Sequence, residues 1–368
     1  MSEILFVTWD GGGNVPPALA IAGELTRRGE TVRFLGHPTQ RDTVAAAGFG
    51  FAPYEAAPPF SSTEENGALR LLSLFTDSRM AEDLRAELRR RPADLVVVDC
   101  LLLGALRACV GLTQPYVVLE HSFDAYVRES VLRGPLGLIA RFKRLRPGRT
   151  WESAQLTLAC TLPSLETSRP SGRPANLRFT GPAQRVPAPH DLESHEPAVL
   201  VSLSTFRFSG MVPALQRVLD ATADLAARVV VTTGPAVDPS ELRAGANHEV
   251  HRYVPHDELM PHVSLVVGHG GHATTMRALA HDLPLVVMPM DALTDQPLVA
   301  DVVARAGAGA RVAKKAGPDQ LRPHIARLLD DGPHRVAAAS LGAQIRELDG
   351  TRGAADLLQG VLRAPASS

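Results

Sequence analysis

The chain of 368 residues has few cysteines, almost no net charge and no long apolar run, and each shortage argues against a class of protein. Its three cysteines, Cys100, Cys109 and Cys160, form neither a paired disulfide framework nor a metal-binding spacing. We therefore expect a reduced protein of the cytoplasm. Lys and Arg number 38 against 39 Asp and Glu, with the signs interspersed. This balance argues against a nucleic-acid partner and against stable association with an anionic membrane.

Long apolar segments and a leader sequence are not found either. No apolar run approaches the roughly 20 residues of a membrane span. The chain passes from Ser2 into the apolar run Ile4–Val7 without a basic region or a cleavage site, so no secretory signal is expected. At about 150 residues for each domain, the length predicts roughly two domains.

Short apolar runs alternate with helical patterns in both halves of the sequence. This alternation is typical of a parallel sheet covered by helices on both faces. It predicts an α/β protein with two doubly wound domains. In the first half we expect strands at 4–8, 31–35, 95–98 and 116–119, and helices at 17–28, 39–47, 80–90 and 103–110. In the second half we expect strands at 199–203, 228–232, 265–267 and 285–288, and helices at 211–221 and 273–280.

Four prolines within residues 182–197 mark the boundary between the domains, because they cannot support regular structure. The prediction is a first domain of residues 1–182, a linker of 183–197 and a second domain of 198–350. A terminal helix is expected at Thr351–Arg363, within a final segment 351–368 that ends in a tail. Open α/β sheets bind ligands beyond the carboxyl ends of their strands, so functional residues are expected just after strands.

The most informative motif is Gly-His-Gly-Gly-His-Ala-Thr-Thr-Met-Arg at residues 268–277. A strand that ends in a glycine turn and opens a helix presents free backbone N–H groups to an anion. His269 and the hydroxyls of Thr274 and Thr275 add side-chain donors. The motif therefore predicts a phosphate-binding turn, although the glycines alone would also suit a tight turn without a ligand.

Three further segments accompany this turn: a strand that ends in hydroxyls, a Tyr-Val-Pro run and an Asp-Gln pair. With them the chain resembles the family 1 nucleotide-sugar glycosyltransferases of GT-B fold, in particular the bacterial branch that decorates antibiotics, macrolides and other polyketides. The resemblance covers nearly the whole chain. It implies two Rossmann-like domains that face each other across a cleft, the first binding the acceptor and the second the nucleotide-sugar donor. It also implies that the terminal helix crosses back to the first domain.

The resemblance assigns donor contacts residue by residue, and every one of them lies in the second half of the chain. The residues assigned to the diphosphate are His269, Gly270, Gly271, His272, Ala273 and Thr274, with Ser204 or Thr205 assisting. Those assigned to the base are Tyr253, Val254 and Pro255, and those assigned to the sugar hydroxyls are Asp295 and Gln296. No metal and no cofactor are implied beyond the dTDP- or UDP-sugar co-substrate, because a helix N-terminus and a histidine can neutralise the diphosphate.

One departure from the family concerns the nucleoside. Many relatives carry a glutamate eight residues after the motif histidine, where it accepts hydrogen bonds from the ribose hydroxyls. Arg277 occupies that position here. The loss of the carboxylate favours a thymidine nucleotide, which has no 2′-hydroxyl, over a uridine nucleotide, but other groups could replace the contact.

A second departure concerns the catalytic base. The family has Gly-His-x-x-Pro after its first strand, and that histidine removes the acceptor proton. The matching residue here is Asn14, and an amide cannot act as a general base near neutral pH. One alternative is that Asn14 caps the following helix, where asparagine is among the preferred residues.

Three side chains are candidates to replace the missing base. Asp10 ends the first strand, but it could instead satisfy turn amides. Asp99 matches the acid that orients the catalytic histidine in relatives, and it could act directly or merely bond the Asn14 amide. His121 follows the next strand and has an unperturbed pKa near 6.5. A fourth possibility is that a phenolic acceptor with a pKa of about 10 or lower needs no strong base.

The segment 122–145 mixes apolar residues with arginines and a lysine. Such a basic amphipathic segment can lie on an anionic membrane or cap an apolar pocket and show its charges to water, and we expect the pocket. The expected function is therefore inverting, metal-independent transfer of a sugar onto a small hydrophobic natural product. The alternatives are a non-catalytic nucleotide-sugar-binding subunit and a variant that forms C- or N-glycosides. The oligomeric state stays open, with a homodimer among the options.

Overall fold

The computed structural model describes residues 1–64, 67–188 and 196–364, and the chain divides into two compact units. Unit 1 comprises Met1–Ser61, Gly67–Arg185 and Leu348–Ser368, and unit 2 comprises Ser62–Asn66 and Val186–Glu347. These bounds compare with predicted domains of 1–182 and 198–350. Part of the predicted linker 183–197, and the tail beyond residue 364, lie outside the described residues.

Unit 1 is built on a sheet of seven parallel strands in the order β3-β2-β1-β4-β5-β6-β7. The strands are β1 (Glu3–Val7), β2 (Thr31–Gly36), β3 (Gly50–Pro53), β4 (Leu95–Asp99), β5 (Tyr116–Glu120), β6 (Leu156–Ala159) and β7 (Leu177–Phe179). Strands β4 and β5 are buried along their whole length. Continuous burial is what a parallel strand experiences when both faces of its sheet are covered.

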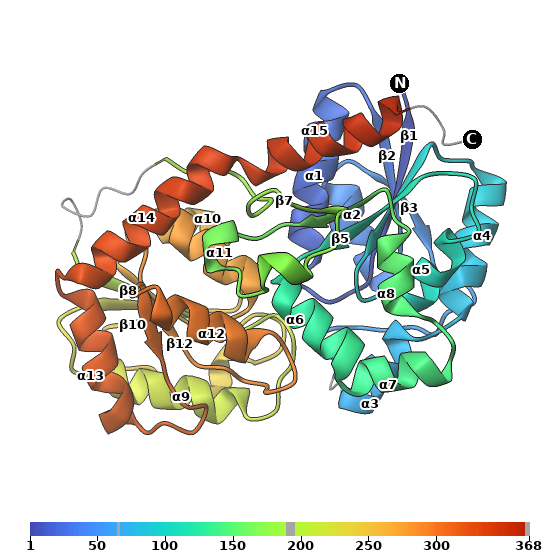
Figure 1. Cartoon of the computed structure of the whole chain (residues 1–368). Coiled ribbons are helices and arrows are strands. Elements are labelled where there is room, and N and C mark those ends of the chain that lie inside the picture. The colour runs from blue at the N-terminus through green and yellow to red at the C-terminus, as the bar shows by residue number, and fades with distance from the viewer. Residues whose placement is uncertain (65–66, 189–195, 365–368) are drawn as a thin grey trace. The chain divides into compact units, whose positions relative to one another are not determined.

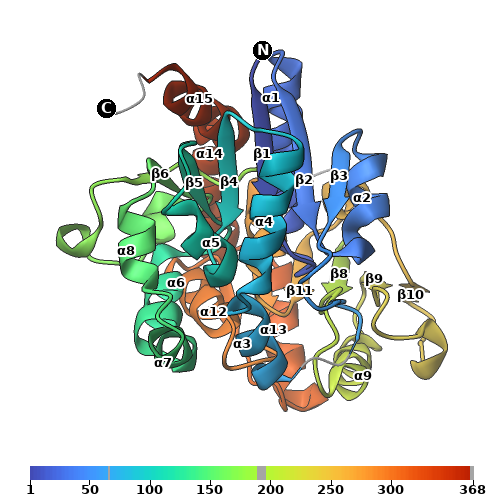
Figure 2. The same ribbon diagram turned by 90° about the vertical axis from the view of Figure 1, so that its right-hand side faces the viewer.

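The helices of unit 1 provide that cover. They are α1 (Val15–Arg27), α2 (Arg41–Ala46), α3 (Ala68–Phe75), α4 (Arg79–Arg90), α5 (Leu103–Cys109), α6 (Asp124–Arg128), α7 (Pro135–Phe142), α8 (Pro147–Glu152) and α15 (Gly350–Arg363). Helices α4 and α5 pack together in front of the sheet in Figure 2. Alternate residues of β1, β4 and β5, such as Phe6, Val97 and Val117, pack with the apolar sides of α1 and α15.

Helix α15, the last of the chain, packs against α1 within unit 1 (Figure 1). A β-carbon on Gly350 would collide with the backbone of Gly181, so glycine lets the start of this helix approach the chain closely. Asp356 pairs with Arg28 at 2.5 Å, and the Thr351 hydroxyl donates to the Gln184 carbonyl at 3.0 Å. The C-terminal segment is therefore part of the first unit's core.

Unit 2 repeats the architecture with six parallel strands in the order β10-β9-β8-β11-β12-β13. The strands are β8 (Ala198–Ser202), β9 (Arg228–Thr232), β10 (His248–His251), β11 (Leu265–Gly268), β12 (Leu285–Val287) and β13 (Gly309–Arg311). The helices are α9 (Met211–Thr222), α10 (His256–Leu259), α11 (His272–Ala280), α12 (Gln296–Arg305), α13 (Pro318–Leu329) and α14 (Pro333–Leu348). The predicted α/β class with two parallel sheets is confirmed.

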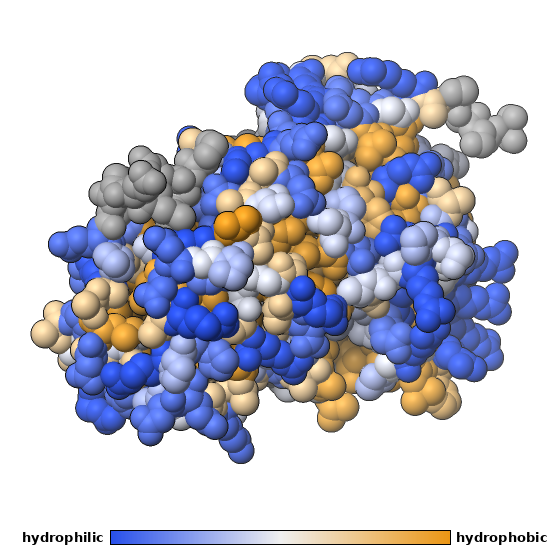
Figure 3. Space-filling view, turned by 60° about the vertical axis from the view of Figure 1, so that its left-hand side comes forward, coloured by the Kyte–Doolittle hydropathy of each residue, from blue (hydrophilic) through white to orange (hydrophobic). Residues whose placement is uncertain are grey.

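Polar and apolar side chains share the surface. The face drawn in Figure 3 carries its apolar residues in groups among hydrophilic ones. Within the described residues, no helix combines the length and the apolar character that crossing a membrane would require.

Burial of His37 makes the stability of unit 1 depend on pH. His37 is fully buried after β2, its ring lies against Tyr54 at 5.0 Å, and burial lowers its pKa to about 4. Because the pKa in the unfolded chain is near 6.5, the unfolded state binds more protons between these values. Stability is therefore lost as the pH falls from about 6.5 toward 4.

We expect His37→Phe, which keeps a ring but cannot titrate, to reduce this acid sensitivity. Between pH 7 and pH 4 the wild type should lose up to about 3 kcal/mol more unfolding free energy than the variant. Urea unfolding of both proteins at a series of pH values measures the difference. Parallel pH dependences would contradict the buried, neutral state of His37.

Candidate functional site

Each sheet has one position at which the strand order reverses, and the predicted site residues follow the strands at that position. In unit 1 the chain runs from β1 outward to β3 and returns to β4 on the other side of β1. In unit 2 the same reversal lies between β8 and β11. Connections that leave such a pair of strands go to opposite sides, and ligands of open α/β sheets bind in the resulting crevice at the carboxyl ends.

Asp99, the last residue of β4, is the centre of the group in unit 1. It is 5% exposed, and its Oδ2 accepts hydrogen bonds from Trp9 Nε1 at 3.1 Å and Asn14 Nδ2 at 3.0 Å. Its Oδ1 accepts from the Leu101 backbone N–H at 3.0 Å. Two side chains of the β1–α1 loop and one backbone amide thus fix this carboxylate on the α1 side of the sheet.

His121 approaches the same carboxylate from the neighbouring strand. Asp99 lies beside Leu119 in the β4–β5 register, and His121, two residues further on, points to the same face of the sheet. His121 Nε2 lies 3.3 Å from Asp99 Oδ2, and its side chain is 16% exposed. The structure therefore brings together two of the predicted alternatives for the base as a histidine–carboxylate pair.

Asn14 precedes α1 but its side chain does not cap the helix, so the predicted capping role is wrong. The amide nitrogen instead lies within hydrogen-bonding distance of Thr8 Oγ1 (3.2 Å), the Trp9 carbonyl (3.0 Å) and Asp99. Thr8 and Trp9 directly follow β1, and Asp99 ends β4. Asn14 is a hydrogen-bond donor to the buried carboxylate.

Asp10, the remaining candidate base, is held elsewhere. Its Oδ2 accepts from the Thr39 hydroxyl at 2.8 Å. The hydrogen bonds and the ion pair that Asp99 makes involve other residues. The structure does not bring Asp10 into the Asp99 group.

Trp9 is a site residue that the sequence reasoning missed. Besides its bond to Asp99, its ring packs edge-on against Phe75 at 4.9 Å and Phe60 at 5.9 Å. A β-carbon on Gly11 would lie 2.5 Å from the indole, so the glycine makes room for it. The available signal was an indole directly after an apolar strand, in the loop that carries Asn14.

The ligand atoms of Asp99, Cys100 and His121 lie within 4.8 Å of one another, a spacing that could hold a metal ion. The donor chemistry does not fit, however. Burial raises the pKa of the Cys100 thiol well above its usual range, which disfavours the thiolate that a metal would need. Both oxygens of Asp99 already accept N–H donors.

In unit 2, the turn between β11 and α11 has a backbone conformation and close contacts that require glycine. Gly270 has φ of +86°, and a β-carbon there would lie 2.7 Å from Val287 Cγ1 and 3.0 Å from the Gln296 carbonyl. Gly271 precedes the helix in an extended conformation. A β-carbon on Gly271 would lie 2.5 Å from His269 Nε2, which places the imidazole beside the start of α11.

The start of α11 offers several uncharged hydrogen-bond donors. The N–H groups of His272, Ala273 and Thr274 belong to the first turn, where no intrahelical acceptor exists. Burial, with a smaller contribution from His256, lowers the pKa of His269 to about 4, so its imidazole is neutral at pH 7. The Phe208 ring, which the sequence reasoning missed, lies 6.0 Å from the His269 ring.

The loop after β8 presents the two predicted hydroxyl residues. Ser204 has φ of 154°, a strained value for a residue with a side chain, and its Oγ accepts from the Phe206 N–H at 2.9 Å. A β-carbon on Gly234 would lie 2.9 Å from the Ser204 carbonyl, so glycine permits the loop to pass close to this strained residue. Thr205 is exposed beside it.

Around α10 the structure places an exposed ring and an ion pair. Tyr253 is 70% exposed and is followed by Val254 and Pro255, which lead into the helix. Arg277 on α11 pairs with Asp257 on α10, with 3.2 Å between Nε and Oδ1. A carboxylate therefore does lie beside the position at which many relatives have a glutamate. It belongs to Asp257 on α10, however, and is paired with Arg277.

Gln296 is 2% exposed, and its Oε1 accepts from the N–H groups of Met290 (2.6 Å) and Asp291 (3.1 Å). Because Oε1 already orders the loop after β12, it is not free to make the predicted contact with the sugar. Asp295 occupies the position before α12 without capping it.

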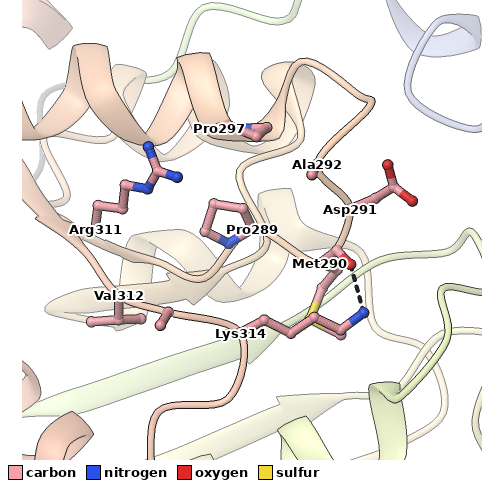
Figure 4. A pocket seen from close by; sticks show the side chains of 9 residues that line it. Pro289, Met290, Asp291, Ala292, Pro297, Arg311, Val312 and Lys314 are labelled. Carbon is pink, nitrogen blue, oxygen red and sulfur yellow. Dashed lines mark hydrogen bonds between the residues drawn. The ribbon is translucent and has the colours of Figure 1, made fainter.

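That loop borders a pocket of about 530 Å³ shown in Figure 4. Lys314 Nζ donates to the Met290 carbonyl at 2.8 Å across one end, and Arg311 pairs with Asp301. The pocket is lined by Pro289, Met290, Asp291, Ala292, Pro297, Arg311, Val312, Ala313 and Lys314.

Comparison with known proteins supports the family suggested by the motifs. Residues 216–347 match the model of the erythromycin biosynthesis protein CIII-like C-terminal domain. The chain is 29% identical over 432 aligned residues to the 4'-demethylrebeccamycin synthase of Lentzea aerocolonigenes, covering 98% of this chain and 100% of that protein.

Solved glycosyltransferases share the fold over the whole length. The glycotransferase of kitacinnamycin aligns with a TM-score of 0.80 at 23% identity, covering 98% of this chain and 99% of that one. The glycosyltransferase VinC in complex with dTDP aligns with a TM-score of 0.72 at 22% identity, covering 98% and 100%. The chain is thus a glycosyltransferase of GT-B fold, similar to the family 1 enzymes of bacterial natural-product biosynthesis.

Proposed function

We propose that this glycosyltransferase moves a sugar from a dTDP-sugar onto a small hydrophobic acceptor with inversion, and that His121 is the general base. The observation that carries the proposal is the 3.3 Å approach of His121 Nε2 to Asp99 Oδ2 where the strand order of unit 1 reverses. The family's base position is filled by Asn14, so the base function has moved to the end of β5.

Asp99 and His121 divide the proton chemistry between them. With Nε2 3.3 Å from the carboxylate, Nδ1 takes the proton of the acceptor hydroxyl as that oxygen attacks the anomeric carbon. The carboxylate stabilises the imidazolium that forms, and the N–H donors of Trp9 and Asn14 keep it in place. Attack on the face opposite the diphosphate inverts the anomeric configuration.

The leaving diphosphate is assigned to the start of α11. The first N–H groups of the helix, its dipole and the neutral His269 donor favour an anion there. The hydroxyls of Ser204 and Thr205 assist from the loop after β8. Because these groups are fixed before the donor arrives, they can stabilise the charge that develops on the leaving oxygen.

The nucleoside is assigned to the edge formed by Tyr253 and the Arg277–Asp257 pair. The exposed Tyr253 ring offers a surface for the base. Arg277 is a donor only, so it cannot accept from a 2′-hydroxyl as a glutamate would. This supports a thymidine donor, and the dTDP bound to the structural relative VinC agrees with it.

The pocket beside Gln296 suits the sugar itself. The backbone of Gln296 touches the Gly270 turn, and the side chain orders the loop that lines the pocket. Its apolar lining residues, among them Met290 and Val312, suit a deoxygenated carbon of the sugar.

The hydrophobic acceptor is supported by the aromatic rings around Trp9 and by exposed apolar side chains. Leu136 and Leu145 are buried, as expected of a capping segment, whereas Leu138 and Phe142 are 58% and 81% exposed. Helix α3, which contacts α7, adds Leu69 at 81% exposure. A large apolar acceptor would cover such side chains.

The test of the function is turnover. The protein is incubated with dTDP- and UDP-sugars and a panel of flat hydrophobic phenols and amines, and products are read by mass and by the anomeric coupling in NMR spectra. Inverted glycosides on hydroxyls are expected. Donor binding without any product would favour the non-catalytic subunit, and C- or N-glycosides would favour the variant chemistry that Asn14 leaves open.

Replacing His121 by Gln should lower kcat by about 10² to 10⁴ while dTDP affinity stays within about twofold. Asp99→Asn should also lower kcat, and Asn14→Ser should do so to a smaller degree because it removes one donor to Asp99. Steady-state kinetics and pH–rate profiles measure these effects. His251→Gln, at an exposed histidine, is the matched control. Unchanged kcat in both His121→Gln and Asp99→Asn would contradict the proposed pair.

Replacing His269 by Ala should weaken dTDP binding by about 10- to 100-fold, the usual effect of losing a hydrogen bond to a charged group. Calorimetry with dTDP measures the affinity. His262→Ala, an exposed histidine of the same unit, should bind like the wild type. Near-identical affinities in the two variants would contradict the diphosphate assignment.

Restoring a glutamate at the ribose edge should change the nucleotide preference. We expect the double variant Arg277→Glu/Asp257→Asn, which avoids two facing carboxylates, to improve the affinity for UDP relative to dTDP by about tenfold. Competition of both nucleotides in calorimetry gives the ratio. An unchanged ratio would show that the nucleoside is selected elsewhere.

A further inference from the structure

Buried polar atoms without hydrogen-bond partners gather behind His121, on the other face of the sheet. Side chains alternate along β5, so Glu120 points away from the face that carries His121 and Asp99. Its strand neighbour β6 and the helices α6 and α8 supply the rest of the group. Within the described residues the atoms are Glu120 Oε1 and Oε2, Asp124 Oδ2, Arg128 Nη2, Trp151 Nε1 and Thr157 Oγ1.

Glu120 is the most unusual member of this group. It is fully buried, and neither of its oxygens accepts a hydrogen bond from any described residue. Burial raises its pKa well above the usual range, and the neighbouring Asp124 carboxylate raises it further. An ionised carboxylate in this position would be a desolvated charge without a donor, a state that carries a large free-energy cost.

None of the charged groups around Glu120 donates a hydrogen bond to it in the structure. Arg128 pairs with Asp124 Oδ1 through Nε. Glu166 accepts four backbone N–H groups, including those of Asp124 and Ala125 at the start of α6. The thiols of Cys100 and Cys160 have pKa values raised by burial and stay neutral.

A proton on Glu120 would allow the two carboxyl groups to bond to each other. A neutral Glu120 has one O–H to give, and Asp124 Oδ2 is a fully buried acceptor with no donor among the described residues. A single hydrogen bond would then give a partner to one oxygen of Glu120 and to Oδ2 of Asp124. Two carboxyl groups that share a site commonly hold a single proton, because two buried like charges repel each other.

We propose that Glu120 carries a proton, donates it in a hydrogen bond to Asp124, and through this bond positions His121. The positioning role rests on the proposed function of His121 as the base. Only His121, Ser122 and Phe123 separate the two acids, so their bond closes a short loop around the base. Ser122 and Phe123 are 2% and 0% exposed, which leaves this loop little freedom of its own.

Glu120 is therefore a positioning residue, which does not touch the reacting atoms. Loss of its bond would leave Asp124 held by Arg128 and, through its backbone N–H, by Glu166, but would remove the direct link between Asp124 and the end of β5. A displacement of a base by about 1 Å can lower a rate by about 100-fold. The proposal predicts an effect on kcat, since the donor-binding residues lie in unit 2.

The first test reads the proton directly and does not need turnover. Infrared spectra of the full-length protein at pH 8 should contain the C=O stretch of a buried, protonated carboxylic acid. Glu120→Gln should remove this band, and Glu129→Gln, at a glutamate whose side chain is 65% exposed, should keep it. A wild-type spectrum without the band, or a band that persists in Glu120→Gln, would overturn the proposal.

The second test reads the positioning. Glu120→Gln keeps a neutral donor of the same shape, so its kcat and its pH–rate profile should match the wild type within about twofold. Glu120→Leu should lower kcat by about tenfold or more, with dTDP affinity by calorimetry unchanged. A Gln variant as impaired as the Leu variant would show that the negative charge is needed, and a fully active Leu variant would show that no positioning occurs.

These outcomes separate the two proposals. If the wild type turns over no acceptor, the proposed function fails, while the infrared band still decides the state of Glu120. If Glu120→Leu does not fold, the infrared comparison and the kinetics of Glu120→Gln decide between a neutral and a charged side chain.

Discussion

The reversal of strand order in each sheet is the constraint on which both candidate sites depend. In each unit the first strand lies in the middle of the sheet, with later strands added on one side and then on the other. The loops at the carboxyl ends of the two central strands therefore diverge, and side chains that follow those strands meet in the space between them. Asp99 with Asn14 in unit 1, and His269 with Ser204 in unit 2, occupy equivalent places in this scheme.

Local features of the site could be predicted from the sequence, and features that depend on strand register could not. The turn at Gly270 is encoded by adjacent residues, and the strand Arg228–Thr232 by a continuous apolar run, so both could be located. Trp9 and Asp99 are 90 residues apart and meet only because β1 pairs with β4. Strand β13, whose three residues are Gly-Ala-Arg, has no apolar run by which it could be recognised, unlike the equally short β12.

Asn14 illustrates how a site can keep its geometry while one of its groups changes chemistry. The amide cannot take a proton, yet it still bonds the Asp99 carboxylate that lies next to it. His121 reaches the same carboxylate oxygen from β5. A carboxylate that accepts from several directions tolerates the exchange of one partner for another, because the remaining donors hold it in place.

The membership of α15 in unit 1 has a consequence for recombining enzymes of this kind. The chain passes from unit 1 to unit 2 near Arg185 and returns near Leu348, so unit 1 is not a single continuous segment. A chimera made by joining the first half of one enzyme to the second half of another would bring a foreign α15 to α1, with its Gly350 contact and its Asp356–Arg28 pair unmatched. Exchanging the donor specificity alone requires two junctions, one before β8 and one after α14, so that each recombined enzyme retains its own C-terminal helix.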